Sequence, residues 1–127
     1  MNANEYQKSA VATAACDHDT IRKRLCGDSS DIDLLHAAMG ICTEAGEFID
    51  PIKKTVFYGK PLDVVNLKEE LGDMLWYIAL AAEAMGTTIG EVMSTNISKL
   101  EARYGGKFTE SAAVIRDLAV EREILEE

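Results

Sequence analysis

The chain has 127 residues, of which 47% are hydrophobic and 28% charged, which is enough for one globular domain with a core of its own. The net charge is −9, and the sequence has no run of more than three basic residues. This composition argues against broad binding to nucleic acid polymers or to an anionic membrane surface. A phosphorylated ligand would need a metal ion to offset its repulsion from the protein.

The cysteines and the N-terminal residues indicate the cellular compartment in which the protein is expected. The three cysteines are odd in number and form no C-x-x-C pair, so we expect reduced thiols, with Cys42 in the core. Residues 1–5 show no basic region followed by an apolar stretch, so we expect no signal peptide. The most apolar segment, 74–85, is too short to span a bilayer and carries Glu83. We therefore expect a soluble, cytoplasmic protein without a membrane partner.

The sequence predicts an all-α fold of about five helices and no strand. Only two prolines and abundant Ala, Leu, Glu and Lys favour helices. A polar loop at 17–30 separates the first two helices, with a turn of helix at 20–25 as an open alternative. Capping side chains and Gly or Pro stop signals set the boundaries. The expected helices cover about 5–15, 30–58, 63–85, 88–104 and 109–127.

Two of these helices carry a pair of carboxylates three residues apart. Glu44 and Glu47 lie in the second helix and Glu70 and Asp73 in the third, and this spacing places each pair on one helix face. Each acid directly precedes a residue of an apolar stripe, and we expect the two stripes to pack against each other. A four-residue connection implies antiparallel packing, with both acid pairs along one rim of the interface. The stripes are Leu34, Ala38, Ile41, Ala45, Phe48 and Ile52, and Val64, Leu67, Leu71, Met74, Ile78, Ala81 and Met85.

Clustered carboxylates favour a bound cation, because each raises the pKa of the next. Mg²⁺ prefers oxygen ligands and retains several waters, so a few carboxylates with substrate phosphates suit it. It would polarise a phosphoryl group and lower the pKa of an attacking water. Single acid pairs are common on solvated helix faces, but two pairs in equivalent stripes of adjacent helices are much rarer by chance. The pattern therefore predicts a magnesium-dependent helical enzyme that acts on phosphates.

Four segments occur together in the middle of the chain: EAGE at 44–47, KK at 53–54, FYG at 57–59 and EELGDMLWY at 69–77. Together they resemble the MazG-like nucleotide pyrophosphohydrolases of the all-α NTP pyrophosphatase superfamily, over about residues 31–108. The resemblance implies a four-helix-bundle-like core completed by dimerisation. It also implies hydrolysis of a nucleoside triphosphate to the monophosphate and pyrophosphate.

The resemblance also implies residue roles. The four acids would bind Mg²⁺, or Mn²⁺ as the alternative ion: Glu44, Glu47, Glu70 and Asp73. Glu47, or else Glu44, would activate the attacking water. Asn96, Lys99 and Arg103 share one helix face and match the family's distal phosphate-binding segment, although a solvated basic face is the simpler alternative. The expected substrate-binding residues are Lys54, Tyr77, Asn96, Lys99 and Arg103.

Two ring side chains have open roles. Trp76, the single tryptophan, either stacks on a base or belongs to the core or to a dimer contact. His36 is expected to be a capped or packed histidine near the start of its helix. No Glu-x-x-His pair of a di-iron bundle occurs in the sequence.

We expect one domain with three parts: an N-terminal helix and loop at 1–30, the catalytic core at 31–108 and a C-terminal helix at 109–127. Apolar residues nearly encircle the second helix, so we expect a homodimer or homotetramer as well as a nucleoside triphosphate substrate. Two other functions stay open. One is phosphoribosyl-ATP pyrophosphatase, and the other is a non-catalytic helical dimerisation or interaction module. Base and sugar preference depend on pocket shape, which motifs do not reveal.

Overall fold

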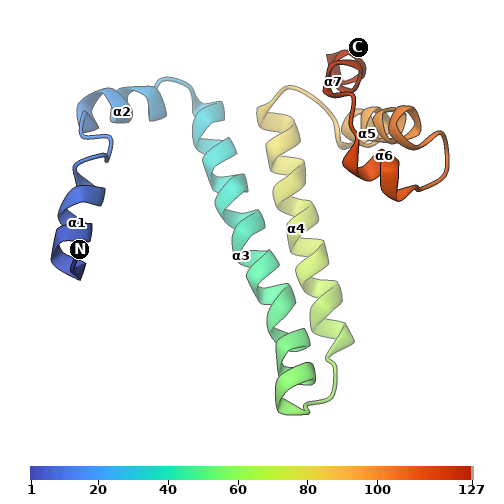
Figure 1. The fold of residues 1–127 in the computed structure, drawn as a ribbon, viewed down its shortest axis with the longest axis horizontal. Helices are drawn as coiled ribbons and strands as arrows, with labels where there is room; N and C mark the ends of the chain where they lie inside the picture. Colours follow the sequence, from blue (N-terminus) through green and yellow to red (C-terminus); the bar gives the residue numbers. More distant parts are fainter. Residues whose placement is uncertain (127) are drawn as a thin grey trace. The chain divides into compact units, whose positions relative to one another are not determined.

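The computed structural model describes residues 1–126, which form seven α-helices and no strand, so the predicted all-α fold is confirmed (Figure 1). No helix among these residues is both long and apolar enough to cross a membrane. The chain divides into two compact units, Met1–Ile32 and Asp33–Glu127. The helices are α1 (Ala3–Val11), α2 (His18–Leu25), α3 (Ser29–Tyr58), α4 (Val64–Ala84), α5 (Ile89–Tyr104), α6 (Glu110–Val114) and α7 (Leu118–Glu126).

The first unit contains α1 and α2. A capping box starts α1: Asn2 Oδ1 accepts from the Glu5 N–H at 2.9 Å, and Glu5 Oε2 accepts from the Asn2 N–H at 2.8 Å. The carboxylate of Asp17 caps α2 by accepting from the Thr20 N–H at 3.0 Å. This cap starts a helix of eight residues, His18–Leu25, so the helical alternative at 20–25 is the one observed, and it begins two residues earlier.

An antiparallel helix pair, α3 and α4, dominates the second unit (Figure 1). Helix α3 continues through Pro51, and the hydroxyl of Thr55 donates to the Pro51 carbonyl at 3.0 Å. The turn begins at Gly59, whose φ of 65° favours glycine. The carboxylate of Asp63 then caps α4 by accepting from the Asn66 N–H at 3.1 Å. These boundaries match the predicted ones.

The most buried part of the α3–α4 contact lies beside the expected apolar stripes, on the faces that carry the acids. On α3 the buried residues are Ala37, Gly40 and Pro51, all on the stripe that carries the acids. On α4 the buried residues are Glu70 and Ala82. Small side chains on α3 leave room for larger ones from α4, so the acid-bearing faces turn toward each other. Four members of the expected α4 stripe are instead exposed, namely Val64, Leu71, Ile78 and Met85.

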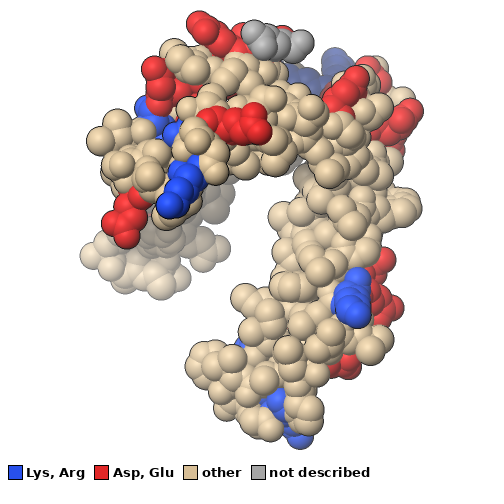
Figure 2. Space-filling model, turned by 90° about the vertical axis from the view of Figure 1, so that its right-hand side faces the viewer, with Lys and Arg blue, Asp and Glu red and all other residues tan. Residues whose placement is uncertain are grey.

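Little apolar surface is buried within one chain. Ala37 and Ala82 are the only buried hydrophobic residues between positions 1 and 126. Cys42, which was expected in the core, is exposed. In Figure 2 the α3–α4 hairpin, in the lower part of the view, presents a mostly uncharged surface. Exposed apolar surface of this extent is typical of a subunit interface.

Helices α5, α6 and α7 form the rest of the second unit, and α5 packs against both other helices. The predicted capping box starts α5: Thr88 Oγ1 accepts from the Glu91 N–H at 3.1 Å, and Glu91 Oε2 accepts from the Thr88 N–H at 2.8 Å. The expected single C-terminal helix is wrong, because it is divided into α6 and α7. A second cap explains the division, since Asp117 Oδ1 accepts from the Val120 N–H at 3.2 Å.

Candidate metal centre

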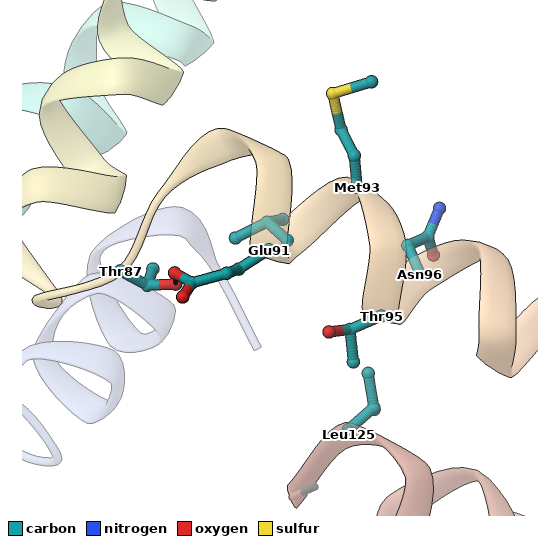
Figure 3. Close-up of a pocket in the computed structure, with 7 residues that line it drawn as sticks. Thr87, Glu91, Met93, Thr95, Asn96 and Leu125 are labelled. Atoms are coloured by element: carbon teal, nitrogen blue, oxygen red, sulfur yellow. Dashed lines mark hydrogen bonds between the residues drawn. The ribbon is translucent and has the colours of Figure 1, made fainter.

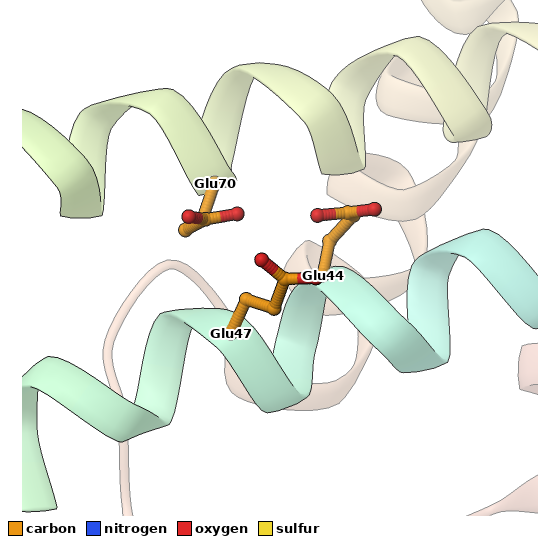
Figure 4. A group of neighbouring side chains, drawn as sticks. All are labelled: Glu44, Glu47 and Glu70. Atoms are coloured by element: carbon orange, nitrogen blue, oxygen red, sulfur yellow. The ribbon is translucent and has the colours of Figure 1, made fainter.

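Three carboxylates from α3 and α4 point toward one another between the helices (Figure 4). Glu44 and Glu47 occupy successive turns of α3, and Glu70 faces them from α4. One oxygen of each lies within 4.8 Å of an oxygen of each of the others. Oxygen donors at this separation suit a hard divalent cation, which also neutralises their mutual repulsion. We call these three residues the acid cluster.

Asp73, the fourth predicted ligand, lies beside the acid cluster. It lines an open depression together with Glu44, Trp76 and Tyr77. Its negative charge contributes to the raised pKa of Glu44. The acid lies one turn after Glu70 on α4, so it adds a fourth carboxylate at the edge of the cluster.

The electrostatics of the cluster favour a cation. Desolvation is the largest cause that raises the pKa of the Glu44 carboxyl, followed by its hydrogen bond with Glu70 and by the charges of Glu47, Asp73 and Glu70. Glu70 is only 5% exposed, and its carboxylate accepts a hydrogen bond from Asn66 Nδ2 at 2.5 Å. The protein therefore holds Glu70 in place, while the shared charge of the cluster is relieved by a proton or by a metal ion.

Sequence reasoning gave Asn66 no role, although it fixes a central carboxylate. The available signal was its position four residues before Glu70, on the same stripe of α4. Tyr77 continues this stripe and lies against Gly40 of α3, where an added Cβ would be 2.2 Å from the Tyr77 Cε1 atom. The absence of a side chain at Gly40 therefore lets the ring of Tyr77 sit between the helices.

Lys54, a predicted substrate-binding residue, has an acidic partner on its own helix. Its Nζ atom lies 2.5 Å from Asp50 Oδ2, and Lys53 Nζ lies 3.1 Å from Asp50 Oδ1. These contacts lower the pKa of Asp50 and raise that of Lys54. In this arrangement the Lys54 ammonium neutralises Asp50.

The predicted basic face of α5 is altered by a partner from α7. Arg103 Nε donates to Glu121 Oε1 at 2.8 Å, and Arg116 Nη2 donates to Glu121 Oε2 at 2.6 Å. Arg103 thus has a carboxylate partner on another helix, in addition to the helix face that it shares with Asn96 and Lys99. Spacing along one helix cannot reveal a partner eighteen residues away.

Asn96 lies apart from the acid cluster, in another depression of the second unit. Figure 3 shows it on α5 next to Thr95, with Glu91 and Thr87 at the start of the helix. Met93 and Leu125 supply apolar parts of this depression. Of the predicted site residues, the structure thus brings together Glu44, Glu47, Glu70, Asp73 and Tyr77.

The Glu121 ion pairs predict acid-sensitive packing of α7. Hydrogen bonds from Arg116 and Arg103 lower the pKa of Glu121 from 4.5 to about 2. Because the pKa of this carboxyl is lower in the folded than in the unfolded protein, its ion pairs stabilise the fold at pH values above about 4.5. This stabilisation is lost as the pH falls from about 4.5 to about 2. Glu121→Gln is expected to lower Tm at pH 7 by on the order of 5–10 °C and to reduce the acid dependence in that window. Circular dichroism melts at several pH values test this, with the exposed Glu123→Gln as the matched control; equal melts for the two variants would refute it.

The fold and site define an all-α protein with a carboxylate cluster between two antiparallel helices. The family model described as the MazG nucleotide pyrophosphohydrolase domain matches residues 34–108, so the chain belongs to the MazG family and the resemblance is confirmed. The chain is also 33% identical over 85 residues to the Gene 37 protein of Mycobacterium phage L5, covering 61% of this chain and 72% of that protein. No solved structure matches the chain.

Proposed function

We propose that this member of the MazG family is a magnesium-dependent nucleoside triphosphate pyrophosphohydrolase that releases the monophosphate and pyrophosphate. The family supports nucleotide pyrophosphohydrolase activity in general. The observation that carries the proposal is the convergence of Glu44, Glu47 and Glu70, with oxygens within 4.8 Å of one another. Four carboxylates on a protein of net charge −9 cannot attract a triphosphate by themselves, so a metal ion is needed to bring substrate and protein together.

The proposed metal ligands are the acid cluster and Asp73, with Mn²⁺ as an alternative to Mg²⁺. When bound, the ion supplies positive charge to the phosphates and lowers the pKa of a coordinated water. Glu70 is buried and hydrogen-bonded to Asn66, so its role is to hold position. Glu47 is the exposed member of the cluster and can meet a solvent water. We assign Glu47 as the base that accepts the water proton, with Glu44 as the alternative.

The proposed reaction is attack of this water on the α-phosphorus. A new bond forms between the water oxygen and that phosphorus, the bond to the oxygen bridging the α- and β-phosphates breaks, and pyrophosphate leaves. Tyr77, at the edge of the cluster, is assigned to the sugar or base. The phosphates are assigned to the four other predicted substrate-binding residues, Lys54, Asn96, Lys99 and Arg103. Lys54 and Arg103 would then exchange Asp50 and Glu121 for phosphate oxygens.

We further propose a cytoplasmic homodimer or homotetramer. The support is physical: the chain buries only Ala37 and Ala82 among the hydrophobic residues of 1–126 and leaves many large apolar side chains in water, including four of the α4 stripe. Association of two or more copies would cover them.

A nucleotide screen tests the proposed activity. Ribo- and deoxyribonucleoside triphosphates and phosphoribosyl-ATP are incubated with Mg²⁺, and monophosphate and pyrophosphate are measured together. We expect equimolar products, loss of activity with a chelator, and a decrease in kcat of about 100-fold or more in Glu47→Gln. The exposed Glu83→Gln on α4 is the matched control and is expected to retain activity. No release from any of these compounds would reject the enzyme and favour a non-catalytic helical module.

A further inference from the structure

Three aromatic rings gather beside the acid cluster. The ring centroids of Trp76 and Tyr77 are 4.9 Å apart with planes at 90°, so the rings meet edge to face. His36 of α3 lies 6.2 Å from the Trp76 ring and 5.6 Å from the Tyr77 ring, again edge on. We call these three residues the ring cluster.

The ring cluster lies at one defined end of the acid cluster. Trp76 follows Glu70 by six positions on α4, which is about 9 Å of axial rise, and His36 precedes Glu44 by eight positions on α3, or about 12 Å. Because the two helices are antiparallel, moving forward on α4 and backward on α3 leads to the same end. A nucleotide can bridge this span, with its phosphates at the acids and its base at the rings.

Trp76 is unusually accessible for the largest apolar side chain, with 57% of its surface exposed. Together with Tyr77 it forms one side of the depression whose other lining residues are Glu44 and Asp73. The depression has a volume of about 430 Å³, within the range of small-molecule sites. Tyr77 is held against Gly40, so the ring next to the acids has a fixed place. The depression therefore combines two carboxylates, of Glu44 and Asp73, with two aromatic rings.

We propose that the ring cluster is the nucleobase subsite and that the base of the substrate stacks on the exposed indole of Trp76, flanked by Tyr77 and His36. This inference rests on the proposed pyrophosphohydrolase function. Stacking on an aromatic face is tolerant of base identity, because every base has a π-face. The subsite therefore recognises a planar heterocycle rather than one base, and both purine and pyrimidine nucleotides are accepted.

Trp76 is the single tryptophan of the chain, so its fluorescence reports this subsite directly. The probes are α,β-methylene nucleoside triphosphates with Mg²⁺, in which the bond to be cleaved is replaced by P–C–P, and inorganic triphosphate as the base-free control. We expect purine and pyrimidine analogues to quench the emission in a saturable way and inorganic triphosphate to leave it unchanged. Absence of quenching by an analogue that binds, as measured by calorimetry, would overturn the proposal.

Kinetics of variants provide the second measurement. Trp76→Ala is expected to raise KM at least about tenfold with a smaller effect on kcat, and Trp76→Phe to restore most of the affinity. His36→Ala, which removes only an edge contact, is expected to raise KM by a smaller factor and to shift the Trp76 emission. Tyr6→Ala removes another exposed aromatic ring, on α1 in the first unit, and is expected to behave as the parent.

The two proposals fail in different ways. If the parent releases pyrophosphate but Trp76→Ala keeps the parental KM, the nucleobase subsite is rejected and the proposed function stands. If the analogues quench Trp76 but no nucleotide is hydrolysed, the proposed reaction is rejected and the base subsite stands. A change in oligomeric state in Trp76→Ala, with no effect of nucleotides on emission, would make Trp76 a subunit contact and reject the subsite.

Discussion

Gly40→Ala is expected to destabilise the protein by about 1–3 kcal/mol and to impair catalysis, although alanine is the better helix former. The added Cβ would lie 2.2 Å from the ring of Tyr77, so either the ring or the whole of α4 must move. Such a shift would separate Glu70 on α4 from Glu44 and Glu47 on α3. Denaturant unfolding and the pyrophosphate assay measure the two effects.

Gly46→Ala is the matched control on the same helix. Nothing lies within 4 Å of a Cβ added at Gly46, so this change is expected to stabilise the fold by about 0.5–1 kcal/mol. Removal of the ring in Gly40→Ala/Tyr77→Ala is expected to recover part of the stability lost in Gly40→Ala, because the clash is gone. Equal stability of Gly40→Ala and Gly46→Ala would show that the close packing of Gly40 and Tyr77 is absent in solution.

Dilution is expected to lower the stability of the protein, because it dissociates the copies that would cover the exposed apolar residues. Sedimentation equilibrium is expected to give a dimer or a tetramer, and Tm is expected to rise with protein concentration, since folding and association are then linked. A monomer with a concentration-independent Tm would contradict the proposed assembly.

Charge placed on the expected interface tests which surface is covered. Leu71, 48% exposed, and Ile78 are among the residues of the α4 apolar stripe that the helix pair leaves exposed. Leu71→Lys and Ile78→Lys are expected to shift the protein toward monomers and to lower its stability, because a charged side chain is costly at an apolar interface. Val114→Lys, at a position on α6 that is 82% exposed, is the control and should leave association unchanged.

Helix boundaries were largely predictable, because caps depend on chemistry local in the chain. Asp63 and the box formed by Thr88 and Glu91 cap the helices they were expected to cap. Gly105, at φ 57°, ends α5 as expected. The differences also concern caps: Asp17 starts α2 two residues before the helical turn considered at 20–25, and Asp117 caps α7 and so divides the expected last helix.

For the candidate site, the sequence alone determined which acids share a helix face, because a spacing of three residues is a property of one helix. The sequence also indicated the family, through motifs that lie within residues 34–108. The tertiary structure decided which faces meet. The apolar stripes predicted an interface with the acids along its rim, but Gly40 leaves space for a large side chain from the other helix and Tyr77 fills it, so the acid-bearing faces lie nearer the centre of the contact.

Contacts between distant segments could likewise not be predicted from the sequence. Arg103 belongs to a basic face by spacing, yet the structure binds it to Glu121 from another helix. His36 joins Trp76 and Tyr77 only because α3 and α4 run antiparallel at one particular register. Periodicity describes one helix at a time, whereas register and partner choice depend on the shapes of two surfaces, and these exist only in the folded chain.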